Sequence, residues 1–258
     1  MSDNGLFSLT GKVAVVIGGG GVLGGAIATG LAQAGSDVAV LGRTKDNAEA
    51  RARSIETLGR GAMGVACDAT SKTALEQTLD DVLKRFGRVD ILVNAAGVNS
   101  GTPFFEITEA EWHRILDIDL TSVFLACQVF GKAMADAGRG GSIINISSAS
   151  SGPPLSKVFT YAVAKAGVNQ ITQFLARELA PHNIRVNAIL PGFFPAEQNR
   201  KLLTQERVAS ILGHTPMNRF GESCELVGAA VYLASQAASS FVTGSILKVD
   251  GGFTAMTI

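Results

Sequence analysis

Short apolar runs alternate with longer amphipathic segments along most of the chain. Seven runs rich in Val, Ile, Leu and Ala are interpreted as strands: residues 12–17, 37–41, 62–67, 89–93, 142–146, 184–190 and 245–249. Between them, apolar residues recur at helical spacing, as in 22–34 and 158–180. Runs that are apolar on both faces are typical of buried parallel strands. The pattern predicts an α/β fold, a doubly wound sheet of seven mainly parallel strands with helices on both faces.

Composition narrows the number of domains and the kinds of partner. The 258 residues are 47% hydrophobic and show no repeat or shift in composition, so we expect one domain covering 1–258. Lysine plus arginine and aspartate plus glutamate both number 22, which gives zero net charge. This balance gives no electrostatic reason to expect nucleic acid or an anionic membrane as a partner. We expect a small-molecule substrate and copies of the same chain instead.

The cysteines and the first residues favour a cytoplasmic protein. Cys67, Cys127 and Cys224 are far apart and lack the spacing of a zinc site, so we predict packed thiols and no metal. Residues 1–12 contain no basic segment followed by a long apolar one, and no uncharged apolar run has membrane-spanning length.

A strand, a glycine turn and a helix follow one another near the start of the chain. The run 12–17 leads into Gly18 to Gly21, and the helical pattern begins at Val22. Glycines let the backbone approach a pyrophosphate, and the free N–H groups of a helix start face the anion. The segment predicts a dinucleotide site in a Rossmann-like domain, although a tight loop alone would show the same glycines.

The residues after the second and third strands bear on the choice of cofactor. Gly42 and Arg43 follow the second strand, and residues 39–44 contain no acid that would bind the ribose 2′-hydroxyl of NAD. An arginine there accommodates the 2′-phosphate of NADP, so we expect NADP, with NAD as the alternative. Asp68 either binds the adenine amino group or caps the helix that starts near Ser71.

The carboxyl ends of the strands are where such sheets bind ligands, and Gly18, Asn94 and Ser148 fall at those ends. The polar stretch 193–214 is too long for a plain connector, and we interpret it as a substrate lid.

Tyr161 and Lys165 are one helical turn apart in the predicted helix 158–180. A cation beside a phenol favours the phenolate and lowers the tyrosine pKa toward the working range. Ser148 lies upstream, where its hydroxyl could bond the oxygen that gains or loses the proton. The three residues suit the interconversion of a carbonyl and an alcohol, although a Tyr–Lys pair at this spacing also occurs by chance.

Together these residues resemble the classical short-chain dehydrogenase/reductase family over almost the whole chain. The matching elements are Gly18 to Gly24, Asp68, Asn94 to Gly97, Ser148, Tyr161, Lys165, Asn187 and Pro191-Gly192. The resemblance implies that Tyr161 is the general acid/base, that Ser148 orients the substrate oxygen and that Lys165 assists both Tyr161 and the ribose. It also implies a homotetramer or homodimer.

The resemblance and the phosphate cradle together give a set of expected cofactor contacts: Gly18, Gly20, Gly21, Val22, Leu23, Arg43, Asp68, Ala69, Asn94, Ala95, Gly97, Tyr161, Lys165, Pro191, Gly192 and Phe194.

Three positions depart from the family pattern. Val22 stands where the family usually has the middle glycine of the turn. Asp119 replaces the usual fourth catalytic residue, an asparagine; it can accept hydrogen bonds from a relay water but has no amide hydrogen to donate. Ala196 replaces a threonine that often contacts the carboxamide.

Within the family, the segments GGGGVLGGAIA, PGFF, EQNR and HTPMNRFGE resemble the D-mannonate oxidoreductase (fructuronate reductase) branch and, less closely, gluconate 5-dehydrogenases. The expected substrate is therefore a sugar acid or polyol, with Arg200 or His214 as candidates to bind its carboxylate. The alternatives are another substrate, such as a 3-oxoacyl thioester or a steroid, and a nucleotide-binding protein without turnover.

Overall fold

The computed structural model describes residues 5–153, 155–194 and 204–256. Its seven strands form one parallel sheet in the order β3-β2-β1-β4-β5-β6-β7. The strands are β1 (Val13–Ile17), β2 (Asp37–Gly42), β3 (Ala62–Ala66), β4 (Ile91–Asn94), β5 (Gly141–Ile146), β6 (Ile184–Pro191) and β7 (Ile246–Val249). All seven predicted strands are confirmed, and neighbouring strands pair in parallel.

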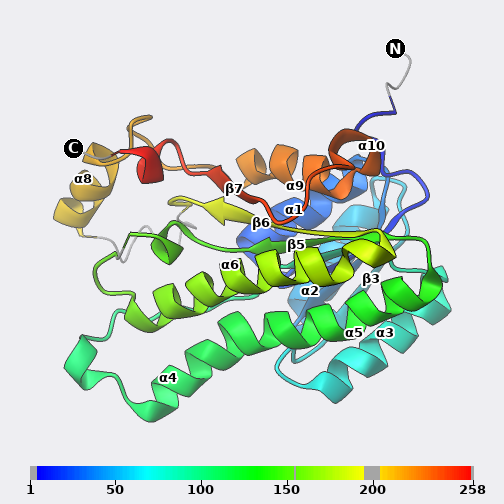
Figure 1. The fold of residues 1–258 in the computed structure, drawn as a ribbon, viewed down its shortest axis with the longest axis horizontal. Coiled ribbons are helices and arrows are strands. Elements are labelled where there is room, and N and C mark those ends of the chain that lie inside the picture. Colours follow the sequence, from blue (N-terminus) through cyan, green and yellow to red (C-terminus); the bar gives the residue numbers. More distant parts are fainter. Residues whose placement is uncertain (1–4, 154, 195–203, 257–258) are drawn as a thin grey trace.

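Helices cover both faces of the sheet, as predicted. They are α1 (Val22–Gln33), α2 (Lys45–Glu56), α3 (Lys72–Phe86), α4 (Glu109–Leu116), α5 (Ser122–Ala137), α6 (Phe159–Leu179), α8 (Gln205–Gly213), α9 (Val227–Ala234) and α10 (Gln236–Ser239). The buried side chains of α1, α2 and α9 pack on one face, and those of α3, α5 and α6 on the other. Figure 1 shows α1 and α9 on one side of the central strands and α5 and α6 on the opposite side.

The alternation of side chains along β1 joins the two layers. Ala14 and Val16 belong to the core under α1, whereas Val13, Val15 and Ile17 belong to the core under α5. Successive side chains of a strand point to opposite faces. Because helices cover both faces of the sheet, all five residues are buried. Each fully buried valine or isoleucine contributes about 1.5–3 kcal/mol by leaving water, so this strand is a large part of the reason that the two layers stay together.

A long helical segment with one irregular turn runs from Thr108 to Gly138. The side chain of Thr108 caps α4 by accepting from the N–H of Glu111, and Gly138 ends α5 with a φ of 65°. Between the two helices, Asp117–Thr121 (η2) forms a π-helical turn. Such turns are rare and occur often at functional sites; this one carries Asp119.

The continuous helix Glu109–Ala137 is long and apolar enough to cross a membrane by length and composition, although it carries charged residues. Half of its most apolar window is buried within the domain. Val123, Phe130 and Met134 pack in the core below the sheet. Core packing therefore accounts for its apolar character.

The strand order reverses direction between β1 and β4. Ile17 at the end of β1 pairs with Leu41 on one side and with Asn94 on the other. The connections leave the two strands toward opposite faces, which opens a crevice beyond their carboxyl ends.

The lid predicted at 193–214 is partly described. Residues 195–203, which include Ala196 and Arg200, lie outside the described residues. Gln205–Gly213 forms α8, and the side chain of Thr204 caps it by accepting from the N–H of Arg207. A helix was not predicted within this stretch.

Candidate active site

A cavity of about 1250 Å³ lies at the carboxyl ends of β1, β4 and β5. Its wall includes the glycine turn, the loops after β2, β3, β4 and β5, the start of α6 and part of α8. The volume exceeds the range of about 300–1,000 Å³ that is usual for small-molecule sites, as a dinucleotide plus a substrate would require.

The glycine turn at one end of the cavity depends on the absence of side chains. Gly18 has a φ of 78°, and a Cβ atom there would lie 2.7 Å from the backbone of Ala95. The N–H of Gly18 donates to the carbonyl of Leu41, and that of Gly21 donates to the carbonyl of Gly18. These constraints bring the turn against the loop after β4, which is the close approach that glycine permits.

The start of α1 is open to an anion. No side chain caps this helix, and its first turn contains no acid. Val22, the departure from the family pattern, is 52% exposed and lines the cavity together with Gly20, Gly21 and Leu23. The uncapped N–H groups and the positive end of the helix dipole suit a phosphate group.

The loops after β2 and β3 form the next part of the wall. Arg43 and Asp68 both line the cavity and are exposed. The Thr70 hydroxyl and the Thr70 backbone N–H both donate to the Asp68 carboxylate. The hydroxyl bond first, then the N–H bond and the Arg43 charge, hold the pKa of Asp68 below its usual value. The cap of α3 is Ser71, whose hydroxyl accepts from Ala74. The interpretation of Asp68 as the helix cap is therefore wrong, and the adenine interpretation stays a prediction.

The side chain of Asn94 does not reach the cavity. It is 3% exposed and donates to Asn145 Oδ1 at 2.8 Å and to Cys127 Sγ at 3.4 Å. Alternation along β4 puts Asn94 on the same face as Leu92, above α5. Asn94, expected as a cofactor contact, does not line the cavity, whereas Ala95 and Gly97 do.

Ser148, Tyr161 and Lys165 lie together on the wall of the same cavity. Tyr161 and Lys165 are on the first turns of α6, and the Lys165 ammonium is 5.5 Å from the centre of the Tyr161 ring. Ser148 follows β5 and caps the short helix Ala149–Ser151 (η3); its Oγ accepts from the N–H of Ser150 at 3.2 Å. The structure brings the three predicted residues to one place.

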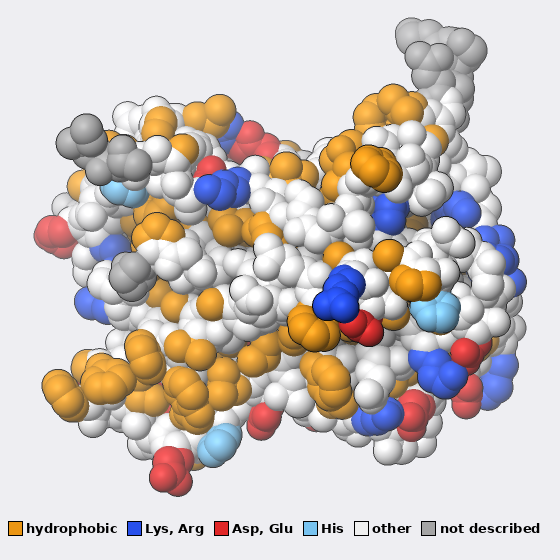
Figure 2. Space-filling model, in the orientation of Figure 1, with side chains coloured by type: hydrophobic (Ala, Val, Ile, Leu, Met, Phe, Trp, Pro, Cys, Tyr) orange, Lys and Arg blue, Asp and Glu red, His pale blue; other side chains and the backbone are white. Residues whose placement is uncertain are grey.

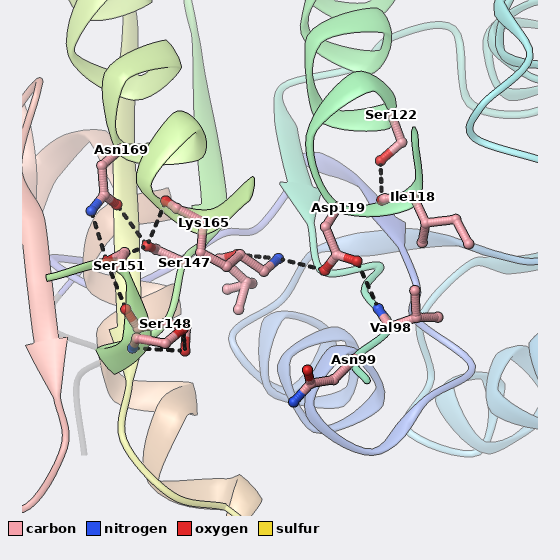
Figure 3. A network of polar contacts seen from close by, with 12 residues as sticks. Val98, Asn99, Ile118, Asp119, Ser122, Ser147, Ser148, Ser151, Lys165 and Asn169 are labelled. Atoms are coloured by element: carbon pink, nitrogen blue, oxygen red, sulfur yellow. Dashed lines mark hydrogen bonds and ion pairs between the residues drawn. The ribbon is translucent and has the colours of Figure 1, made fainter. Parts of the chain in front are cut away.

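The Lys165 ammonium is held from two directions. It donates to the Ile146 carbonyl at 3.1 Å and forms an ion pair with Asp119 Oδ1 at 3.3 Å. The other Asp119 oxygen accepts from the N–H of Val98 at 3.0 Å. Figure 3 shows this chain of contacts running from α6 through η2 to the loop after β4.

Asp119 is fully buried and does not line the cavity, so its predicted catalytic role is not supported by direct access to ligands. A Cβ at Gly97 would lie 2.7 Å from Asp119 Oδ1, so a glycine there makes room for the carboxylate. Oδ1 accepts no hydrogen bond from the described residues besides this ion-pair contact. Burial raises the pKa of Asp119, against the opposing charge of Lys165.

The residues after β6 complete the cofactor end. Gly192 and Phe194 line the cavity, whereas Pro191 is buried as the last residue of β6 and does not. A Cβ on Gly192 would lie 2.7 Å from the Cα of Asp250, so the chain passes too close for a side chain. Asn187 serves the fold: its amide donates to the Val242 carbonyl and accepts from the N–H of Ser245.

Some polar residues of the cavity wall were not predicted as individual site residues, although the last four fall in the predicted lid: Asn47, Asn99, Ser100, Lys157, Thr204, Glu206, Arg207 and Ser210. A helix-start signature at Thr204 was the signal available for the α8 residues. For the loop residues, only the fold brings them to the wall.

A second cavity of about 590 Å³ shares Leu155, Phe193, Arg207 and Ser210 with the first. His214 lines the second cavity and lies edge-on to Phe253, with ring centres 4.7 Å apart. His214 does not line the first cavity.

Cys67 and Cys127 are buried free thiols, as expected. Burial raises the pKa of Cys127 to about 12. Cys224 is exposed, so the prediction that it is packed is wrong. No cluster of potential metal-binding side chains occurs among the residues the structure describes.

Comparison with known proteins identifies the family. Residues 21–254 match the family model described as enoyl-(acyl carrier protein) reductase. The uncharacterized oxidoreductase UxuB of Bacillus subtilis is 40% identical over 269 residues, covering 96% of each chain. The 5-keto-D-gluconate 5-reductase of Escherichia coli is 36% identical over 250 residues, covering 96% of this chain and 98% of that protein.

A solved structure extends the likeness to three dimensions. The gluconate 5-dehydrogenase of Burkholderia cenocepacia, in complex with NADP and tartrate, superposes with a TM-score of 0.92 at 33% identity and covers 97% of this chain and 98% of that one. With the seven-stranded parallel sheet and the Ser148, Tyr161 and Lys165 arrangement, these matches show that the chain belongs to the classical short-chain dehydrogenase/reductase family.

Proposed function

We propose that the protein is an NADP-dependent oxidoreductase that interconverts a carbonyl and a secondary alcohol of a sugar acid of the gluconate type. One observation carries the proposal: Ser148, Tyr161 and Lys165 share a cavity with an open glycine turn. Proton-transfer groups and a dinucleotide cradle are the two requirements of this chemistry.

The residues of the cavity fit NADP. The backbone at Gly18 and the uncapped start of α1 would hold the pyrophosphate, and Arg43 would meet the 2′-phosphate. The similar gluconate 5-dehydrogenase was crystallised with NADP, which supports the same choice here. When bound, this cofactor supplies or accepts the hydride.

The proton step falls to side chains of α6 and of the loop after β5. Tyr161 gives its proton to, or takes it from, the reacting oxygen, and Ser148 donates a hydrogen bond to the same oxygen. The Lys165 ammonium stabilises the negative charge that develops on the phenol, which is favourable in a partly water-excluded site. Asp119 acts indirectly: the ion pair and its bond to Val98 support the position of Lys165.

For the substrate, we give the similar proteins more weight than the resemblance of short sequence segments. The branch resemblance favours D-mannonate or fructuronate, whereas the 5-keto-D-gluconate 5-reductase and the gluconate 5-dehydrogenase support the alternative of a gluconate-type acid. We therefore propose a keto acid such as 5-keto-D-gluconate as the substrate to be reduced.

The test follows nicotinamide absorbance with NADPH or NADH across 5-keto-D-gluconate, D-fructuronate, neutral ketoses and acetoacetyl thioesters. We expect the highest kcat/KM with NADPH and the keto-gluconate, and a loss of at least about a hundredfold in kcat for Tyr161→Phe. Val163→Ala, on the same helix and 40% exposed, serves as the control. Preference for the thioester would replace the substrate class, and unchanged turnover in Tyr161→Phe would remove Tyr161 from the mechanism.

We further propose that the protein forms a homotetramer or homodimer through an exposed aromatic patch. Phe104 and Phe105 of the short helix η1 (Phe104–Glu106) and Phe159 of α6 are 60%, 98% and 47% exposed. Phe104 packs edge-on against both of the other rings, and Trp112 of α4 contacts Phe159. Hydrophobic side chains gather over these elements at the lower left of Figure 2. Contiguous exposed apolar surface of this kind marks interaction sites.

The single domain over 1–258 and a cytoplasmic location stay part of the proposal. The buried free thiols of Cys67 and Cys127 suit a reducing compartment. A single cooperative unfolding transition of the full chain would support one domain. Cell fractionation followed by detection with an antibody tests the location.

A further inference from the structure

The cavity has a cationic corner away from its cofactor end. Lys157, in the loop before α6, and Arg207, on α8, both line the wall there. Lys165 also lines the cavity, but its charge is paired with Asp119. Lys157 and Arg207 are therefore the cations at this corner, among the described residues, that the mechanism does not use.

The Arg207 guanidinium bridges two elements that are far apart in the sequence. Its Nη1 donates to Ser156 Oγ at 3.1 Å and its Nη2 donates to the Ser156 carbonyl at 3.2 Å. Two bonds to one residue fix the plane of the guanidinium, and the group carries more N–H donors than these bonds use. Arg207 also lines the second cavity, so it lies at the junction of the two.

Lys157 is the residue next to the one that Arg207 binds. Its φ of 65° is in the left-handed region, which residues other than glycine rarely adopt. It directly precedes Val158, the residue before α6, so it lies four residues from Tyr161 along the chain. Strained backbone of this kind is concentrated at functional sites. Lys157, Arg207 and Tyr161 all line the same cavity, and Arg207 is bonded to the residue that precedes Lys157.

One acid lines the same corner. Glu206 lines the cavity and is the acid in the first turn of α8. The described charged groups of the corner are two cations and one anion, and the anion lies in the first turn of α8, where the positive end of the helix dipole stabilises it. The balance favours an anionic ligand.

We propose that Arg207, assisted by Lys157, binds the carboxylate of the substrate. This inference rests on the proposed function, because 5-keto-D-gluconate has its carboxylate at the opposite end of the carbon chain from the reacting carbonyl. A guanidinium binds a carboxylate through two parallel N–H bonds, which also fixes direction along the chain. Arg207 would then decide which carbon of the acid faces Tyr161.

The test compares Arg207→Gln and Arg207→Lys with wild type, using the holoenzyme, 5-keto-D-gluconate and a neutral six-carbon ketose. Lys84→Gln, an exposed lysine of α3, removes one charge far from the cavity and is the matched control. We expect Arg207→Gln to raise the KM for the keto acid about tenfold to a hundredfold more than the KM for the ketose. Arg207→Lys recovers part of this discrimination, and Glu206→Gln lowers the KM for the acid. The proposal is overturned if Arg207→Gln raises the KM for the acid and for the ketose equally. It is also overturned if Arg200→Gln abolishes the preference for the acid while Arg207→Gln keeps it.

A second measurement separates this proposal from the proposed function. We expect D-gluconate to raise the midpoint of thermal unfolding of the protein–NADP complex in wild type and not in Arg207→Gln. If wild type reduces no keto sugar acid but this protection depends on Arg207, the proposed function fails and the carboxylate site stands. If protection is equal in both proteins, or absent from both, the carboxylate site is wrong, whatever the turnover.

Discussion

Lys165 and Asp119 form an ion pair with 3.3 Å between Nζ and Oδ1, and their side chains are only 3% and 0% exposed. The pair joins α6 to the π-helical turn η2, and the second Asp119 oxygen ties both to the loop after β4 through Val98. Three segments that are distant in sequence therefore meet at one buried charge pair. The departure from the usual family asparagine at position 119 places a carboxyl group rather than an amide beside the lysine.

Removal of the Asp119 carboxylate would leave the Lys165 ammonium buried and unpaired. We expect Asp119→Ala to lower the free energy of unfolding by about 3–5 kcal/mol, as for other broken buried pairs. Asp119→Asn keeps an acceptor for the Val98 N–H and should cost less. Asp81→Ala removes the acid of an exposed pair with Lys84, 3.6 Å away, and should cost at most about 1 kcal/mol. Urea denaturation measures all three, and equal losses in the buried and exposed variants would contradict the interpretation.

Arg43 is expected to select NADPH over NADH. Arg43→Ala removes the cation that lines the cavity after β2, and one charged hydrogen bond is worth about 1.5–3 kcal/mol. We expect the KM for NADPH to rise about tenfold to a hundredfold, with that for NADH nearly unchanged. Lys45→Ala, at the exposed first residue of α2, is the matched control because Lys45 does not line the cavity. A parallel rise for both cofactors would exclude the 2′-phosphate role.

The aromatic patch makes a prediction about assembly. Phe105→Asp places a charge on a side chain that is 98% exposed, so it should leave the fold of a monomer intact while it weakens contact between subunits. We expect light scattering to show a smaller assembly for this variant. Trp112 is the single tryptophan of the chain and lies in the patch, so its emission should shift to longer wavelength as the subunits separate. Phe241→Asp, at a fully exposed position, is the control. An unchanged mass for Phe105→Asp would place the subunit contact elsewhere.

Glu225, in the short 3₁₀ helix Ser223–Leu226 that precedes α9, links stability to pH. Bonds from the Arg219 guanidinium lower the pKa of Glu225 from 4.5 to about 2. Because the folded-state pKa is the lower one, the stabilisation is present above about pH 4.5 and is lost as the pH falls toward 2. The midpoint of thermal unfolding of Glu225→Gln should therefore lie below that of wild type at pH 7, and the gap should narrow with acidity. Because the pair is exposed, the gap should be small and should shrink in high salt. A gap that widens at low pH would contradict the assignment.

Much of the fold could be predicted because its signals are local. The seven apolar runs, the glycine turn and the Tyr161–Lys165 spacing each depend on neighbours within a few residues, and each is present in the structure. A period of two or of 3.6 residues is a property of one segment, so it can be recognised without knowledge of its partners.

The tertiary structure decided which of these residues face the cavity. Asn94 ends the predicted strand but points into the core, because its face of the sheet lies against α5 and Cys127. Asp119 is next to Lys165 only because a π-helical turn crosses beside α6, and Arg207 reaches Ser156 across 51 positions of sequence. The amino-acid sequence determined the elements and the chemical groups that they carry. Which groups meet depended on the packing of helices against the sheet, since burial and ion pairing join segments whose separation along the chain leaves no periodic trace.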